Sequence, residues 1–203
     1  MSGTSAERRR AAAPRTAAAI IDAAEALLDR GARLTVGAVA AEAGVSRPTL
    51  YAHYPTAAEM VEAVLERSAA ESLAAVDAAR PDQGPPRDAL ERLLAVALDR
   101  LGRWDALARD AAGQLGADAG DRAYGPLTER VTALVARGRD EGAFRADLPA
   151  EWLVTMFPAL VRGAAEHARA HALDRAGALE LLTRTARDVY LLDPGGRKKR
   201  RGR

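Results

Sequence analysis

Apolar positions along most of the chain recur every three to four residues, which is the spacing of one face of an α-helix. The clearest early example runs from Pro14 to Arg30, where Ile20, Ala24 and Leu28 fall on one side. Gly31 follows and marks the end of this helix. Apolar and polar residues do not alternate as they would in a half-buried strand. The pattern therefore predicts an all-α protein.

Two short helices joined by a tight turn are predicted between residues 34 and 56. Thr35 is a good N-cap for the first of them, and Ser46 for the second. Gly44 stands between them, where a left-handed residue is needed to end one helix and turn sharply. Leu50 and Tyr54 are expected to face the core. This is the arrangement of a helix-turn-helix, whose second helix fits the major groove of DNA.

The exposed face of the second helix carries side chains that donate hydrogen bonds. Arg47 and Thr49 are the better candidates for base edges, and Tyr51 and His53 for phosphates. Pro48 either packs on a thymine methyl group or only starts the helix. The candidate DNA-binding residues are Thr35, Ser46, Arg47, Pro48, Thr49, Tyr51 and His53.

The segment AGVSRPTLYAHYP, residues 43–55, resembles the signature of the tetracycline-repressor (TetR) family of bacterial transcription regulators. The resemblance extends from about Arg15 to about Met60. It departs from the family at Ala57, where a lysine is frequent, and at Gly37, where an arginine is frequent. The resemblance implies a homodimeric repressor that binds a palindromic operator in double-stranded DNA. It also implies a dimer formed by the last two helices and a C-terminal ligand-binding domain.

The rest of the chain is divided by two breaks rich in proline and glycine, at residues 81–86 and 142–149. Thr56, with Glu59 three residues later, is predicted to cap a long connecting helix. Further helices are expected at Arg87–Leu101, Asp105–Leu115, Tyr124–Glu141, Pro149–His171 and Leu173–Leu192. The expected organisation is a disordered basic arm at 1–13, a DNA-binding domain at 14–56, the connecting helix at 57–80, a ligand-binding and dimerisation domain at 81–193, and a disordered basic tail at 194–203.

Composition narrows the class of protein. The 203 residues include no cysteine, which excludes disulfides, thiolate catalysis and cysteine-ligated metals. We find no serine-nucleophile turn and no glycine-rich phosphate loop, so we expect no enzymatic activity and no cofactor. His167 and His171 have a metal-capable spacing but lack a third ligand, so we expect no metal site. No apolar run is long enough to cross a membrane, and we expect a cytoplasmic protein.

The net charge of +2 conceals an uneven distribution. Residues 1–55 carry a net charge of +2, and residues 197–203 carry +6. Together these segments exceed the total by six charges, so residues 56–196 carry −6. Basic ends on an acidic body are typical of a chain whose ends meet nucleic acid. Two interpretations stay open for each basic segment. Arg8–Arg10 either form an arm that enters the minor groove or are only solvated, and the tail either contacts DNA nonspecifically or is only solvated.

Aromatic and soft side chains beyond residue 80 are candidates for a ligand pocket, because such residues line apolar cavities as well as ordinary cores. We expect a small apolar or amphipathic effector near Trp104, Tyr124, Trp152, Met156 and Phe157. For the dimer face of the last helix the expected residues are Leu173, Ala176, Leu179 or Glu180, Thr183, Ala186 or Arg187, and Tyr190. Its core side is expected at Leu181, Leu182, Val189 and Leu192. The alternatives are an activator, a regulator without a ligand, or a helical enzyme or adaptor with an incidental N-terminal motif.

Overall fold

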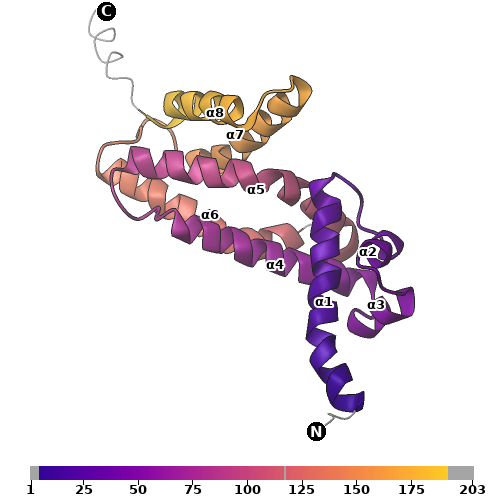
Figure 1. Cartoon of the computed structure of the whole chain (residues 1–203). Helices are drawn as coiled ribbons and strands as arrows, with labels where there is room; N and C mark the ends of the chain where they lie inside the picture. The colour runs from indigo at the N-terminus through magenta and orange to yellow at the C-terminus, as the bar shows by residue number, and fades with distance from the viewer. Residues whose placement is uncertain (1–4, 117, 192–203) are drawn as a thin grey trace, which may run out of the picture. The chain divides into compact units, whose positions relative to one another are not determined.

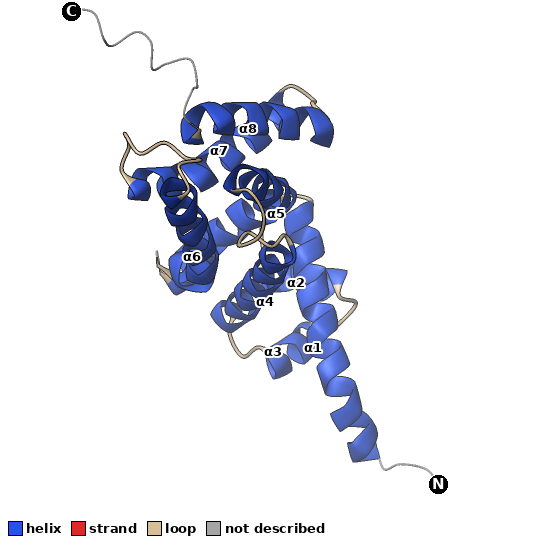
Figure 2. Cartoon of the chain, turned by 90° about the vertical axis from the view of Figure 1, so that its left-hand side faces the viewer, coloured by secondary structure: helices blue, strands red, loops and turns tan. Residues whose placement is uncertain are grey.

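The computed structural model describes residues 5–116 and 118–191, without the side chains of residues 5–13, 101–106, 108–114 and 121. Eight α-helices and no strand occur in these ranges (Figures 1 and 2), which confirms the all-α prediction. The helices are α1 (Ser5–Asp29), α2 (Val36–Glu42), α3 (Arg47–His53), α4 (Ala57–Ala78), α5 (Pro86–Leu115), α6 (Ala119–Asp140), α7 (Ala150–Ala170) and α8 (Arg175–Tyr190).

The chain divides after Ala70, Leu101 and Ala123 into two compact units. Helices α1 to α3, the first part of α4 and the segment Gly102–Ala123 form the first unit, and the remainder forms the second. These limits differ from the domain boundaries expected at residues 57 and 81. The reason is that α4, α5 and α6 each contribute residues to both units.

In the first unit, α1 contacts both α2 and α3, and these two helices contact each other. The buried side chains lie at the positions that the helical spacing predicted. The core includes Ile20, Ala24, Leu28, Val39, Leu50, Met60, Val61 and Val64.

Helix α1 begins at Ser5, nine residues before the expected start at Pro14. The prediction of a disordered arm over residues 1–13 is therefore wrong for residues 5–13, while residues 1–4 lie outside the described part. Alanine and arginine, which fill this stretch, are strong helix formers. Pro14 has a φ compatible with a helix and lies inside α1 instead of starting it.

In the second unit, the turn between α4 and α5 is held by two arginine side chains. Arg92 donates hydrogen bonds to three backbone carbonyls and Arg137 to two, all within residues 79–84 and all 2.7 to 2.9 Å long. The last carbonyls of a helix lack partners within the helix, and basic side chains can supply them. Helix α4 ends at Ala78, just before the predicted break at residues 81–86, and the residues between α4 and α5 form a fixed turn and not a boundary between units.

Helix α5 is continuous from Pro86 to Leu115, so the expected break between residues 101 and 105 is wrong. A single glycine such as Gly102 costs a helix only about 1 kcal/mol relative to alanine. Ending one helix and starting another would leave backbone groups at both new ends without helical partners. Helix α6 likewise begins at Ala119, earlier than the expected start at Tyr124.

Helices α7 and α8 pack against each other in the second unit. Phe144, in the link between α6 and α7, packs edge-on against Tyr190, with ring centroids 5.7 Å apart. Gly138 makes room for Phe144, because an added Cβ there would clash with its ring. The buried positions of α8 are Ala178, Leu182, Ala186 and Tyr190, spaced four residues apart. The prediction for Leu182 is confirmed, whereas Ala186 and Tyr190 belong to the core and not to an outer face.

Within residues 5–116 and 118–191, no helix combines the length and the apolarity that a membrane span needs.

Candidate nucleic-acid interface

The two short helices of the first unit are capped as the sequence predicts. The Thr35 hydroxyl accepts a hydrogen bond of 3.1 Å from the backbone N–H of Ala38, and Ser46 accepts one of 3.2 Å from that of Thr49. Gly44 has a φ of +66°, the left-handed value that a sharp turn requires. The predicted helix-turn-helix is therefore present in the structure.

One face of α3 is buried and the other meets solvent. Leu50 is fully buried, and it fixes the rotation of the helix against the core. Arg47, Pro48 and Thr49 are exposed, and the Tyr51 side chain is 46% exposed. His53 is half-buried. The structure thus leaves Arg47, Pro48, Thr49 and Tyr51 of α3 accessible to solvent, with the caps Thr35 and Ser46 also exposed.

Thr49 takes part in the cap as well as in the exposed surface. Its hydroxyl lies 2.8 Å from that of Ser46, within hydrogen-bond distance. The Ser46 oxygen also accepts from the backbone N–H of Thr49. This arrangement leaves the methyl group of Thr49 and two of the three hydrogen-bond sites of its hydroxyl for an incoming partner.

The end of α3 leads directly into α4. Tyr54 is the C-cap residue of α3, and its backbone N–H donates to the carbonyl of Leu50 at 2.9 Å. Its side chain is half-buried, short of the full burial expected for a core residue, and this burial raises the pKa of the phenol. Thr56 then caps α4, accepting from the backbone N–H of Glu59 at 3.1 Å. The Glu59 carboxylate accepts from the Thr56 hydroxyl at 3.3 Å, so the predicted pairing is present with the hydroxyl as donor.

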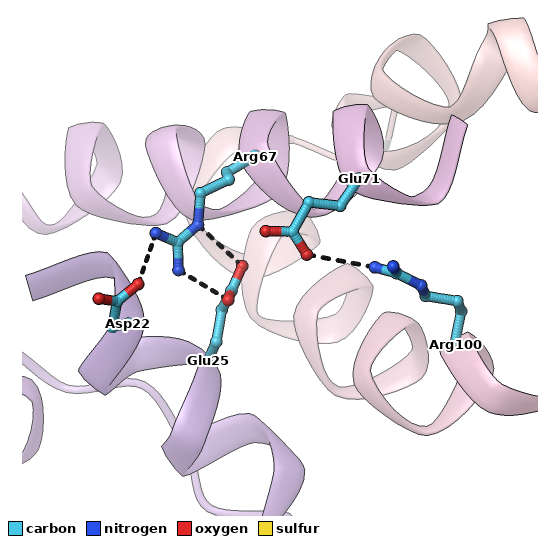
Figure 3. A network of polar contacts seen from close by, with 5 residues as sticks. All are labelled: Asp22, Glu25, Arg67, Glu71 and Arg100. Atoms are coloured by element: carbon cyan, nitrogen blue, oxygen red, sulfur yellow. Dashed lines mark hydrogen bonds and ion pairs between the residues drawn. The ribbon is translucent and has the colours of Figure 1, made fainter. Parts of the chain in front are cut away.

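A charged network behind this surface ties α1 to α4 (Figure 3). The Arg67 guanidinium donates two hydrogen bonds to Glu25, of 3.1 and 2.7 Å, and one of 2.7 Å to Asp22. Glu25 is only 9% exposed, and its hydrogen bond is the main cause that raises the pKa of Arg67. Figure 3 also draws a separate pair in the second unit, in which Arg100 donates to Glu71 at 3.2 Å.

Sequence reasoning missed this network. Arg67 and Glu25 are 42 residues apart, so no local pattern joins them. The only signal was the position of Glu25 itself. It follows the buried Ala24 and precedes the buried Leu27 and Leu28, on a stretch of α1 that is otherwise apolar. A carboxylate so placed needs a positive partner.

The five candidate ligand residues differ in burial. Tyr124 and Phe157 are buried, and Met156 is half-buried. Trp152 is 51% exposed, so it faces away from the core of its own unit. Trp104 lies in α5, but its side chain falls outside the described residues. Burial alone therefore supports Tyr124 and Phe157 better than Trp152 as parts of an internal pocket.

The two histidines of α7 and its C-terminal turn contact each other. The rings of His167 and His171 stack with centroids 4.0 Å apart, and Nδ1 of His171 lies 3.0 Å from the carbonyl of His167. Across the part of the chain that the structure describes, no group of three or more potential ligands is arranged to hold a metal ion.

Comparisons with known proteins agree with this geometry. The family described as "Bacterial regulatory proteins, tetR family" matches residues 20–64, which span the C-terminal part of α1, the helix-turn-helix and the start of α4. The HTH-type transcriptional repressor LfrR of Mycolicibacterium smegmatis is 36% identical over 85 residues. That alignment covers 42% of this chain and 45% of LfrR, so the chain matches less than half of this relative.

Solved structures are similar over a larger part of the chain. The TetR-like regulator LfrR from Mycobacterium smegmatis, in complex with proflavine, has a TM-score of 0.69 and 25% identity, with 85% of this chain and 94% of that chain covered. A transcriptional regulator from Saccharomonospora viridis, in complex with choline, has a TM-score of 0.75 with 89% and 100% covered. At 19% identity, the second likeness concerns the fold alone.

Proposed function

Since the chain belongs to the tetR family of bacterial regulatory proteins, we propose that it is a sequence-specific DNA-binding repressor. It acts as a homodimer on a palindromic operator and leaves that operator when a small apolar or amphipathic ligand binds. One observation carries the DNA-binding part of this proposal. Leu50 anchors α3 in the core, and this leaves Arg47, Thr49 and Tyr51 on an exposed helix of the size that enters a major groove.

DNA binding uses the residues of both short helices. Arg47 and Thr49 are the candidates for base edges, and Tyr51 and His53 bind phosphates. Pro48 either packs on a thymine methyl group or only starts the helix. The caps Thr35 and Ser46 stand at the starts of the two helices, and their exposed hydroxyls add polar contacts to the backbone. The DNA-binding domain is the stretch 14–56, and the remaining helices serve ligand binding and dimerisation.

The homodimer is formed by α7 and α8. Opposite its buried residues, α7 presents Trp152, Met156, Ala159 and Gly163, at intervals of three or four residues. The exposed Leu173 extends this apolar stripe past the end of α7. On α8, the residues turned away from the core are Ala176, Glu180 and Arg187. Of the small residues of α7, Ala164 belongs to the core, and Gly163 is free to allow a close approach by a second copy.

The proposal that a small ligand releases the protein from DNA is supported by similar proteins and by the buried aromatic residues of the second unit. LfrR has been solved with proflavine, and a regulator of the same fold with choline. A ligand that releases DNA must itself bind more weakly when the operator is present, because coupling between two sites is reciprocal. Proflavine is a suitable first probe, with its affinity measured with and without operator DNA. Equal proflavine affinities with and without operator DNA would rule out proflavine as a ligand that releases this protein from its operator.

Other functions fit less well. An activator or a regulator without a ligand would use the same α3 surface, and reporter expression with and without the protein separates these from a repressor. A helical enzyme or adaptor in the cytoplasm would have no use for the exposed donors of α3. Selection of bound duplexes from a random DNA pool tests the proposal: a palindromic sequence should be enriched, and a pool that stays random would refute sequence-specific binding.

A further inference from the structure

Gly37, the second residue of α2, lies directly beneath the side chain of Arg47. A Cβ atom added to Gly37 would stand 2.7 Å from Nη2 of Arg47, 3.5 Å from its Cζ and 3.6 Å from its Nε. The guanidinium group therefore rests on the bare backbone of α2. Any larger side chain at position 37 would take this space.

Backbone conformation does not account for a glycine at this position. Gly37 lies within α2 and does not have a positive φ. Alanine would stabilise the helix relative to glycine. What Gly37 provides is the space that the guanidinium occupies.

The position of Arg47 on α3 explains why its side chain turns toward α2. Arg47 is three residues before Leu50, so the two share one side of α3. Leu50 is fully buried on that side. Arg47 is nevertheless exposed. Its charge is thus available to a partner from solution.

We infer that Gly37 and Arg47 act together in DNA binding: Gly37 leaves the space in which the Arg47 guanidinium lies beside α2, and there the guanidinium binds a DNA phosphate and not a base edge. This inference rests on the proposed function. In a bound helix-turn-helix the first helix crosses the DNA backbone while the second enters the groove. A guanidinium that rests on the first helix is therefore placed to meet phosphates. It replaces the expectation that Arg47 reads bases.

Gly37→Ala tests the pair without removing a charge. The atom nearest to the new methyl group is the end of a flexible side chain, so Arg47 moves and the fold is kept. We expect affinity to fall about tenfold, equally on the duplex selected by the wild-type protein and on a scrambled duplex of the same composition. The slope of log affinity against log salt concentration is negative, and its magnitude should decrease by about 0.9 for each bound chain.

Three further variants complete the experiment. Arg47→Ala should match Gly37→Ala, and the double variant should bind no more weakly than Arg47→Ala alone, because both changes remove one contact. Arg47→Lys should keep most of the affinity and the same preferred sequence, since lysine also binds phosphate. Gly125→Ala, at a helical glycine of the second unit with open space around it, is the matched control and should leave DNA binding unchanged.

The contrary outcomes are distinct. The inference is overturned if Gly37→Ala binds like the wild-type protein, if its loss persists in full on the Arg47→Ala background, or if Arg47→Lys changes the preferred base pairs. A wild-type protein that binds neither duplex would instead refute the proposed function, and the inference with it.

Discussion

The hydroxyl of Tyr190, near the end of α8, donates a hydrogen bond of 2.6 Å to the backbone carbonyl of Leu153 in α7. Tyr190 is fully buried, and the backbone N–H of Arg145 donates to its carbonyl at 2.8 Å. One side chain therefore joins the two helices that we assign to the dimer, and its backbone holds the link that precedes α7.

Replacing Tyr190 by phenylalanine should lower the free energy of unfolding by about 1 to 2 kcal/mol, because the ring still fills its place and only the hydrogen bond is lost. Urea unfolding of the full chain measures this difference. Tyr51→Phe, on an exposed ring, is the control and should unfold like the wild-type protein. Equal stabilities of the wild-type and Tyr190→Phe proteins would show that the bond adds nothing.

The same tyrosine predicts a pH dependence. Burial raises the pKa of Tyr190 above its ordinary value of about 10. Because the folded state holds the phenolic proton more tightly than the unfolded chain, the stability gained is complete below about pH 10 and is lost as the pH rises toward the folded pKa. The stability gap between wild type and Tyr190→Phe should therefore narrow above about pH 10. A stability gap that widens above about pH 10 would contradict a raised pKa of Tyr190 in the folded protein.

Removal of Arg67 should destabilise the protein by about 2 kcal/mol, because the largely buried Glu25 carboxylate would lose its two hydrogen bonds from the guanidinium. The variant is Arg67→Met, measured by urea unfolding. Adding Glu25→Gln should restore part of the loss, since the buried side chain is then neutral. Arg130→Met, which breaks an exposed pair with Asp77, should have a smaller effect. Additive losses in the double variant would disprove the coupling.

Tyr51 and Thr49 should differ in what their loss does to DNA binding. Tyr51→Ala should weaken binding to all duplexes by a similar factor, because a phosphate contact carries no base information. Thr49→Ala should change the preferred sequence, at about 1 to 3 kcal/mol for particular base pairs. Repeating the selection with each variant tests both. A changed preference with Tyr51→Ala, together with an unchanged overall affinity, would invert the two roles.

Trp152→Glu should convert the dimer to a monomer, because it places a charge in the apolar stripe of α7 without touching the core. Sedimentation equilibrium of the full chain measures the mass directly. Glu151→Gln, at the exposed neighbouring position, is the control and should remain dimeric. A dimeric Trp152→Glu protein would place the interface elsewhere.

The sequence predicted local features best. Thr35, Ser46 and Gly44 act on neighbouring residues, so caps and turn can be inferred from a few positions. The break predicted within α5 was wrong because Gly102 is only a weak helix breaker. The outer face predicted for α8 was partly wrong, because spacing indicates which residues share a side but not which side meets the core.

Long-range contacts could not be predicted in the same way. Arg67 meets Glu25 across 42 residues, and Arg137 meets the carbonyl of Pro81 across 56. Many arginines in the chain could satisfy any given acceptor, and the sequence does not rank them. The contact between Arg47 and Gly37 could not be predicted for another reason. Glycine has no side chain, so nothing in the sequence indicates which residue occupies the space beside it.

The most direct test of the account is the ratio of two dissociation constants, measured for the wild-type protein at one salt concentration. One duplex carries the palindrome enriched by selection, and the other has the same composition in scrambled order. We predict that two chains bind the palindrome at least about 10³-fold more tightly than the scrambled duplex. Equal constants for the two duplexes would contradict the claim that α3 reads a DNA sequence.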